Sequence, residues 1–115
     1  MTRNFPNDEN GDVLRRMYES GDDLSKPRYI DFAGVFPTEL EAASFAAHFR
    51  EMGYTTAYKR SELVAELPWN VVITSFMVPD HAAITELENL LQRIASPLSG
   101  RNDGWGCFER PGIDH

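Results

Sequence analysis

The sequence predicts an α+β fold of the ferredoxin-like type, an α/β sandwich in which two helices cover one face of a four-stranded antiparallel sheet. Two segments carry apolar residues at steps of three and four, which is the spacing of one helix face. Segments rich in aromatic and β-branched residues flank them and are typical of strands. After a short N-terminal helix, the order of elements is therefore βαββαβ, the split βαβ arrangement.

The first expected helix spans residues 8–20. Asp8 or Asn10 serves as its N-cap, and Gly21 ends it. Its apolar stripe consists of Val13, Leu14 and Met17. A helix with one such stripe is expected to dock on the rest of the domain.

Strands are expected at residues 28–36, 54–59, 69–78 and 101–108. Gly34 interrupts the first, which indicates a bulge or a close backbone approach. The third is apolar on both faces over its centre, so we place it inside the sheet. The connection at residues 60–68 is expected to hold one helical turn at residues 61–64.

The two helices of the core begin at recognisable caps. Thr38 and Glu41 form a capping box before one helix, and Asp80 caps the other. Gly53 and Pro97 end them. The apolar faces are Ala42, Phe45, Phe49 and Met52 in the first helix, and Ile84, Leu87, Leu91 and Ile94 in the second.

The totals favour one small globular domain. A chain of 115 residues with 42% hydrophobic residues can build a core without staples. We expect a flexible N-terminus at residues 1–9, a single α/β domain at 10–110 and a tail at 111–115. Cys107 stands alone, which favours a reducing compartment. With no signal-like segment, and no apolar run near the ~20 residues of a membrane span, a cytoplasmic location is expected.

The net charge of -7 disfavours direct binding to nucleic acid, because phosphate backbones repel an acidic chain. An RNA-binding sheet is the competing interpretation, with aromatic residues on its open face. Those aromatic residues are Tyr54, Tyr58, Phe76 and Trp105. They lack an accompanying Lys/Arg cluster. A basic protein segment is therefore the preferred partner.

Catalytic and metal-binding patterns are weak. A small enzyme would have to use Cys107, His48, His81 or His115, yet no Cys/His pair has zinc-ligand spacing. We expect Cys107 to be a buried structural residue and His81 to be solvated. Asp22 and Asp23 are adjacent, but no oxygen-ligand repeat follows, so a solvated loop is expected. The sequence predicts no metal and no cofactor.

Gly104-Trp105-Gly106 is the most specific local feature. Two glycines cost a strand about 0.5–1 kcal/mol each, so the pattern indicates a bend or a close neighbour. One interpretation is that Trp105 packs under the N-terminal segment or against the helices. The other is that Trp105 is an exposed anchor for a partner, since tryptophan is enriched at interface hot spots.

Three parts of the chain together carry a resemblance to a known family. They are Gly21-Asp22-Asp23-Leu24 running into Tyr29-Ile30-Asp31-Phe32, the helix followed by Gly53-Tyr54, and Asp103-Gly104-Trp105-Gly106 followed by Phe108 and Glu109. In these features the chain resembles the RraB-like family, regulators or inhibitors of ribonuclease E activity. They span most of the chain, and the last is the most specific.

The resemblance implies a ferredoxin-like fold and a non-enzymatic role. It also implies a partner, the non-catalytic scaffold region of the endoribonuclease, which is rich in basic segments. The founding member of the family has a strongly acidic C-terminal extension, whereas here only Glu109 and Asp114 are acidic beyond the last expected strand. The resemblance therefore supports the fold more strongly than the particular partner.

We expect a partner-binding surface made of an apolar anchor and an acidic rim. Its expected members are Trp105, Phe108, Asp103, Asp22, Asp23 and Asp31. The alternative is a homo-oligomeric or small-ligand-binding protein of the same fold, unrelated to RNA decay. A dimer of this kind would use Tyr54, Tyr58 and Phe76 on the open face of the sheet, and both monomer and homodimer stay open.

Overall fold

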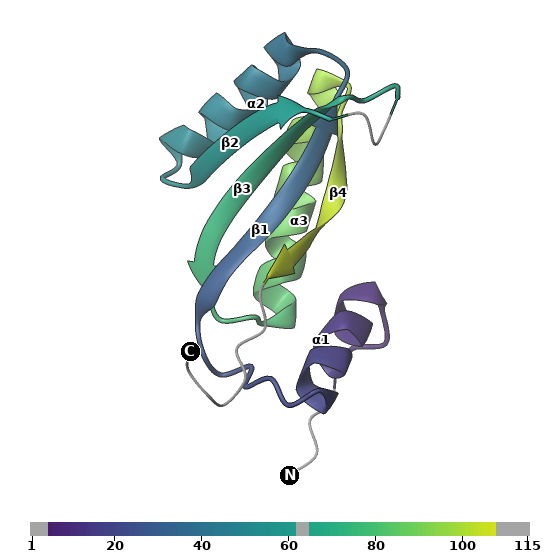
Figure 1. The fold of residues 1–115 in the computed structure, drawn as a ribbon, viewed down its shortest axis with the longest axis vertical. Coiled ribbons are helices and arrows are strands. Elements are labelled where there is room, and N and C mark those ends of the chain that lie inside the picture. The colour runs from purple at the N-terminus through teal and green to yellow at the C-terminus, as the bar shows by residue number, and fades with distance from the viewer. Residues whose placement is uncertain (1–4, 62–64, 108–115) are drawn as a thin grey trace.

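The computed structural model describes residues 5–61 and 65–107, apart from the side chain of Cys107. Figure 1 shows the elements and their labels. In chain order they are α1 (Glu9–Glu19), β1 (Arg28–Phe36), α2 (Glu39–Glu51), β2 (Thr55–Arg60), β3 (Trp69–Met77), α3 (His81–Ala95), the 3-10 helix η1 (Ser96–Leu98) and β4 (Arg101–Cys107). Each predicted element is present near its expected bounds, and the turn expected at 61–64 falls largely outside the described residues.

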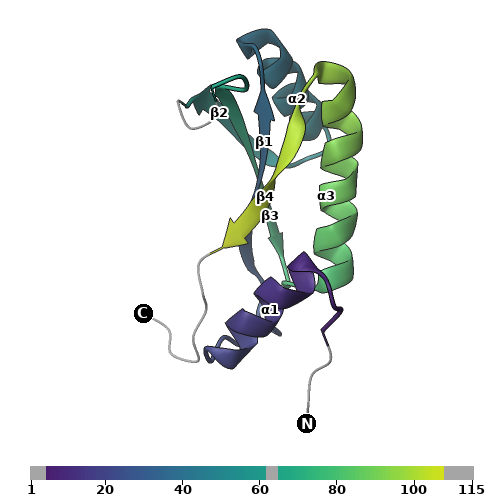
Figure 2. The same ribbon diagram turned by 90° about the vertical axis from the view of Figure 1, so that its right-hand side faces the viewer.

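The four strands form one antiparallel sheet in the order β2-β3-β1-β4. Helices α2 and α3 lie on the same face of this sheet, and no described helix covers the other face, which we call the open face (Figures 1 and 2). The α+β, ferredoxin-like prediction is confirmed, as is the interior position of β3. Helix α1 lies beyond this sandwich, at one end of α3 (Figure 2).

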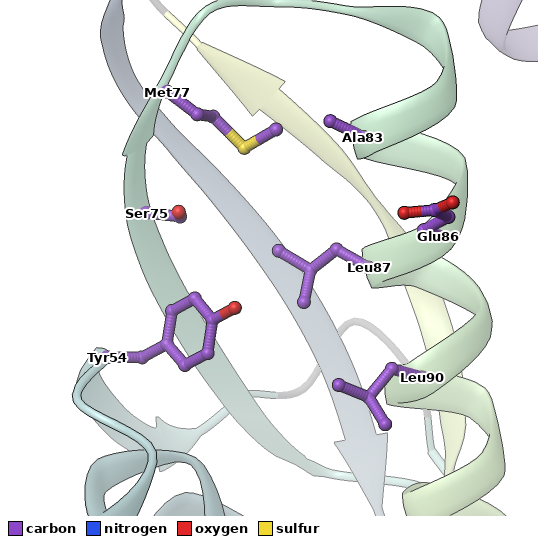
Figure 3. A pocket seen from close by; sticks show the side chains of 7 residues that line it. All are labelled: Tyr54, Ser75, Met77, Ala83, Glu86, Leu87 and Leu90. Atoms are coloured by element: carbon purple, nitrogen blue, oxygen red, sulfur yellow. The ribbon is translucent and has the colours of Figure 1, made fainter.

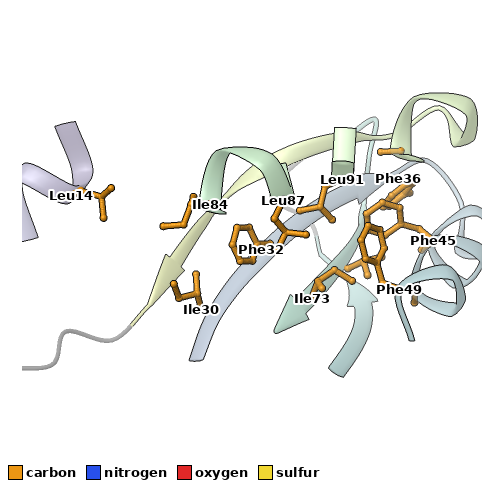
Figure 4. Close-up of a cluster of buried hydrophobic side chains, with 14 of the residues drawn as sticks. Leu14, Ile30, Phe32, Phe36, Phe45, Phe49, Ile73, Ile84, Leu87 and Leu91 are labelled. Carbon is orange, nitrogen blue, oxygen red and sulfur yellow. The ribbon is translucent and has the colours of Figure 1, made fainter. Parts of the chain in front are cut away.

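The core lies between the sheet and the two helices (Figure 4). Along β1, Ile30 and Phe32 are buried toward the helices, whereas Tyr29 and Asp31 point to the open face. Thr38 and Asp80 accept hydrogen bonds at the starts of α2 and α3, so both predicted caps are confirmed. The labelled core side chains are Leu14, Ile30, Phe32, Phe36, Phe45, Phe49, Ile73, Ile84, Leu87 and Leu91.

The pairing of β1 with β4 contains the expected irregularity beside Gly34. The register shifts between Phe32 and Gly34, so β4 carries an extra residue there, and Gly104 has a φ of +101°. A glycine adopts this φ readily, whereas the Cβ of other residues would crowd their own backbone there. A Cβ added at Gly34 would lie 3.4 Å from the ring of Phe45, so the strand also approaches α2 closely.

Within the described part of the expected flexible segment 1–9, the chain makes specific contacts. Phe5 packs against the core cluster, and the Asp8 side chain accepts a hydrogen bond from Gly11 N at the start of α1. Of the two candidate caps, Asp8 is therefore the one used. Its carboxylate also lies 2.9 Å from His81 Nε2, the first residue of α3. The contact joins the starts of two helices that are distant in sequence.

The Asp8 carboxylate predicts a pH-dependent contribution to stability. The backbone N–H of Gly11, and then the His81 ring, hold the pKa of Asp8 below its ordinary value of 3.8. Asp8→Asn keeps a good N-cap but removes the charge. Because the folded pKa is lowered, the charge stabilises the fold above pH 3.8, and this contribution disappears as the pH falls through the lowered pKa.

Urea unfolding at a series of pH values measures this contribution. The free energy of unfolding of the parent protein should exceed that of Asp8→Asn near neutral pH, and the two should converge in acid. A constant difference at every pH would show that the charge of Asp8 contributes nothing.

Candidate protein-binding surface

An open groove of about 370 Å³ lies where α1, α3 and β4 meet. We call it the acidic groove. The residues that line it are Glu9, Asn10, Val13, Glu88, Asn102, Asp103, Gly104 and Trp105. These include Trp105 and Asp103 from the expected partner-binding surface.

A hydrogen-bond network holds the three elements of the acidic groove together. Trp105 Nε1 donates to Asn10 Oδ1 at 2.8 Å. Asn10 Nδ2 in turn donates to Glu88 Oε1 at 2.8 Å and to Thr85 Oγ1 at 3.2 Å. Asn102 Nδ2 donates to the other oxygen of Glu88 at 3.0 Å. The network fixes α1 against α3 and β4, and its link between Asn10 and Trp105 spans most of the sequence.

Trp105 is half-buried, on the same side of the sheet as the core. It is directly opposite the fully buried Phe32, and it packs against the core cluster. The interpretation that it packs under the N-terminal segment or against the helices is therefore confirmed. Trp105 still lines the groove, so its part in binding a partner stays a prediction.

The acidic groove carries charge of one sign. Glu9, Glu88 and Asp103 line it, and within the described part of the chain no lysine or arginine does. Glu9 and Asp103 are exposed. Glu88 is half-buried and engaged by two amide groups. The groove therefore favours a positively charged ligand, with Glu9 and Asp103 the carboxylates most accessible to it.

Asp22 lies away from the acidic groove and is buried. Its Oδ2 accepts a 2.7 Å hydrogen bond from Arg28 Nη1, and the exposed fractions of the two side chains are 0% and 2%. The expectation that Asp22 lies in a solvated loop is therefore wrong. Its carboxylate can be buried because Arg28 supplies a buried counter-charge. The buried Asp22 side chain is not accessible to a partner.

Asp23 is exposed, as expected, and is bound within its own loop. The Ser25 hydroxyl donates to its Oδ1 at 2.6 Å, and the Ser25 backbone N–H does so at 3.1 Å. These two bonds, the hydroxyl first, hold the pKa of Asp23 below its ordinary value. Its carboxylate is ionised and accessible, but it is not among the residues of the acidic groove.

Asp31 lies on the open face of the sheet, where it accepts a 2.7 Å hydrogen bond from Thr74 Oγ1. That face is opposite the helices, whereas Trp105 points toward them. Phe108 lies outside the described residues. The structure thus brings Asp103 and Trp105 together and separates Asp22 and Asp31 from them.

The aromatic residues expected on the open face divide between the two faces. Tyr58 is opposite the buried Val71, and Tyr54 lines a groove on the helix side. With Trp105 also on that side, only Phe76 of the expected set is on the open face. There its ring lies 4.8 Å from that of Tyr29. Tyr54, Tyr58 and Trp105 were expected on the open face, where aromatic side chains could stack on RNA bases or form a dimer interface. That expectation is wrong for these three residues.

The candidate catalytic residues do not form a site in the part of the chain that is described. His81 is half-buried against Asp8, so the expectation that it is solvated is wrong. His48 is exposed on α2 with its ring 5.6 Å from Phe49. His115 and the side chain of Cys107 lie outside the description. Among the described residues no group of three His, Cys, Asp or Glu side chains could hold a metal ion.

The sheet order, the helices on one face and the acidic groove define a small α+β domain with a surface suited to a cationic ligand. Within residues 5–61 and 65–107, no helix is both long and apolar enough to cross a membrane. A family model for RraB, described as regulator of ribonuclease activity B, matches residues 7–107. The chain belongs to this family, whose name describes regulators of ribonuclease activity. The comparison with curated proteins finds no match.

Proposed function

We propose that the protein regulates a ribonuclease of the ribonuclease E type by binding a basic segment of its non-catalytic scaffold. The protein acts in the cytoplasm and catalyses no reaction itself. Membership of the RraB family supports the regulatory role. The observation that carries the binding mode is the acidic groove, which Glu9, Asp103 and the half-buried Trp105 line together.

The groove matches the chemistry of such a segment. A lysine or arginine of the partner would pair with Glu9 or Asp103, and an arginine would also stack on the indole of Trp105. Trp105 is already held by Asn10, so little side-chain freedom is lost on binding. The contact between these carboxylates and a basic side chain is electrostatic. Because both carboxylates are exposed, dissolved salt screens this attraction and weakens binding.

The double variant Glu9→Gln/Asp103→Asn tests this mode. It should weaken binding to the scaffold region about tenfold at low salt, because each exposed ion pair contributes roughly 0.2–1 kcal/mol. The measurement is isothermal titration calorimetry at two salt concentrations. The salt dependence of the affinity should also become shallower in the variant.

The matched control is Glu39→Gln/Glu51→Gln, which removes the same charge from exposed positions on α2. It should bind the scaffold nearly as the parent protein does. Equal losses in the two double variants would mean that only net charge matters. Undiminished binding by Glu9→Gln/Asp103→Asn would exclude the acidic groove.

A further inference from the structure

A second groove, of about 340 Å³, lies on the other flank of α3, between α3 and the end of β3, with Tyr54, which follows α2, at its far side (Figure 3). We call it the α2–α3 groove. It is lined by Tyr54, Ser75, Met77, Ala83, Glu86, Leu87 and Leu90. None of these residues lines the acidic groove.

The groove exists because the two helices cover different parts of the sheet. Helix α2 packs mainly over β2 and β3, and α3 packs mainly over β4 and β1. The helices diverge toward the end of β3 (Figure 1). Ser75 and Met77 therefore point to the helix side without being fully covered. Leu90 on α3 is likewise only half-buried.

Polar groups with unused bonding capacity border the apolar floor. Tyr54 points toward α3 from the far side of the groove, and Glu86 lies on α3 (Figure 3). The described residues provide no hydrogen bond to the hydroxyls of Tyr54 and Ser75 and no ion pair to Glu86. An apolar floor with a few polar groups converging on it is the usual form of a binding site.

We propose that the α2–α3 groove binds a basic peptide segment. One aliphatic side chain of the segment packs on Met77, Leu87 and Leu90, and a lysine or arginine next to it pairs with Glu86. The charge of the lining selects this occupant, because Glu86 is the one charged residue among the described residues of the lining and the chain carries a net charge of -7. The unbranched Met77 adapts to different aliphatic shapes.

This inference goes beyond the proposed function, because it holds whichever protein supplies the segment. It places one carboxylate of α3 on each flank of the helix, of which Glu86 is the exposed one. Glu88 faces the acidic groove and Glu86 faces the α2–α3 groove. Residues two apart on a helix point in different directions, so the two sites are chemically related but separate.

Methyl-labelled full-length protein tests the inference by NMR, with synthetic peptides as probes. The peptide Lys-Arg-Leu-Lys-Lys should shift the methyl signals of Met77, Leu87 and Leu90. Replacing its leucine by alanine should weaken binding about tenfold, since a buried leucine contributes mainly through its apolar area. Glu86→Gln should weaken binding about two- to fivefold, and the exposed control Glu39→Gln should leave it unchanged.

Three results would overturn the inference. They are no shift of the three methyl signals at millimolar peptide, equal shifts with Glu-Glu-Leu-Glu-Glu, and shifts confined to Val13 in the acidic groove. No nuclease is present in this experiment. A negative result here therefore leaves the scaffold-binding proposal untouched. Equally, a failure of the scaffold-binding proposal would leave this inference untouched.

Discussion

Arg28→Met is expected to lower the free energy of unfolding by about 3–5 kcal/mol, because it removes one member of a buried ion pair. The side chains of Arg28 and Asp22 are 2% and 0% exposed, with a 2.7 Å bond between them. Arg28 Nη2 also donates to the backbone carbonyl of Asp23 at 2.8 Å. Methionine fills a similar volume but satisfies neither acceptor.

Urea unfolding followed by circular dichroism measures this loss. The matched control is Arg15→Met, which makes the same chemical change at an ion pair that is 41% and 46% exposed. That pair, between Arg15 and Asp12, should contribute no more than about 1 kcal/mol. If the two variants lost the same free energy, burial of the Arg28–Asp22 pair would add nothing to stability.

The buried pair also bears on the acidic groove. Arg28 opens β1, and Asp22 follows the end of α1, so their bond fixes the loop between these two elements. The loop sets where α1 lies, and α1 brings Asn10 to Trp105. Disruption of the pair should therefore loosen the acidic groove as well as the fold. Groove binding should be compared only among variants that unfold like the parent protein.

Local patterns were sufficient to predict the fold. The capping box at Thr38 and the cap at Asp80 mark helix starts through bonds that reach only three residues along the chain. The apolar steps in α2 and α3 identify buried faces, because helix geometry places those residues on one stripe. Over residues 28–33, strand β1 alternates between buried and more exposed positions, so its core-facing residues there follow from the sequence.

The same alternation contained a signal for the buried pair. Arg28 is in phase with Ile30 and Phe32, which places a cation on the core side of β1, where it needs an anion. The adjacent Asp22 and Asp23 look alike in the sequence, and only the folded loop decides which one meets Arg28. The face on which Trp105 lies depends on a bulge in β4, which breaks the alternation.

Other parts of the candidate site depend on contacts between distant segments. The register of β2 against β3 decides that Tyr58 lies opposite Val71 on the helix side, and nothing in β2 itself specifies this register. Asn10 looked like a possible helix cap, but it binds Trp105, far along the chain. Such partners are chosen by how the elements pack, so a single sequence could indicate the residue types without showing how they pair.

Phe45→Ala is the second substitution expected to have a large effect, a loss of about 3–5 kcal/mol in the free energy of unfolding. The Phe45 ring is fully buried, with centroids 4.6 Å from that of Phe36 and 4.9 Å from that of Phe49. Phe76→Ala is the matched control. That ring is 56% exposed and contacts Tyr29, so its loss should cost less than about 1 kcal/mol.

The cost at Phe45 should depend on Gly34, which lies beneath its ring. A Cβ added at Gly34 would lie 3.4 Å from Phe45 and 3.2 Å from Phe36, so Gly34→Ala should destabilise the parent protein. When Gly34→Ala is made in the Phe45→Ala variant, the added methyl group enters the space left by the ring. The stability cost of Gly34→Ala should therefore be smaller there, by about 0.5–1 kcal/mol, than in the parent protein. Strictly additive losses in this double-mutant cycle would mean that the core collapses around the missing ring, because no cavity would then remain for the methyl group to fill.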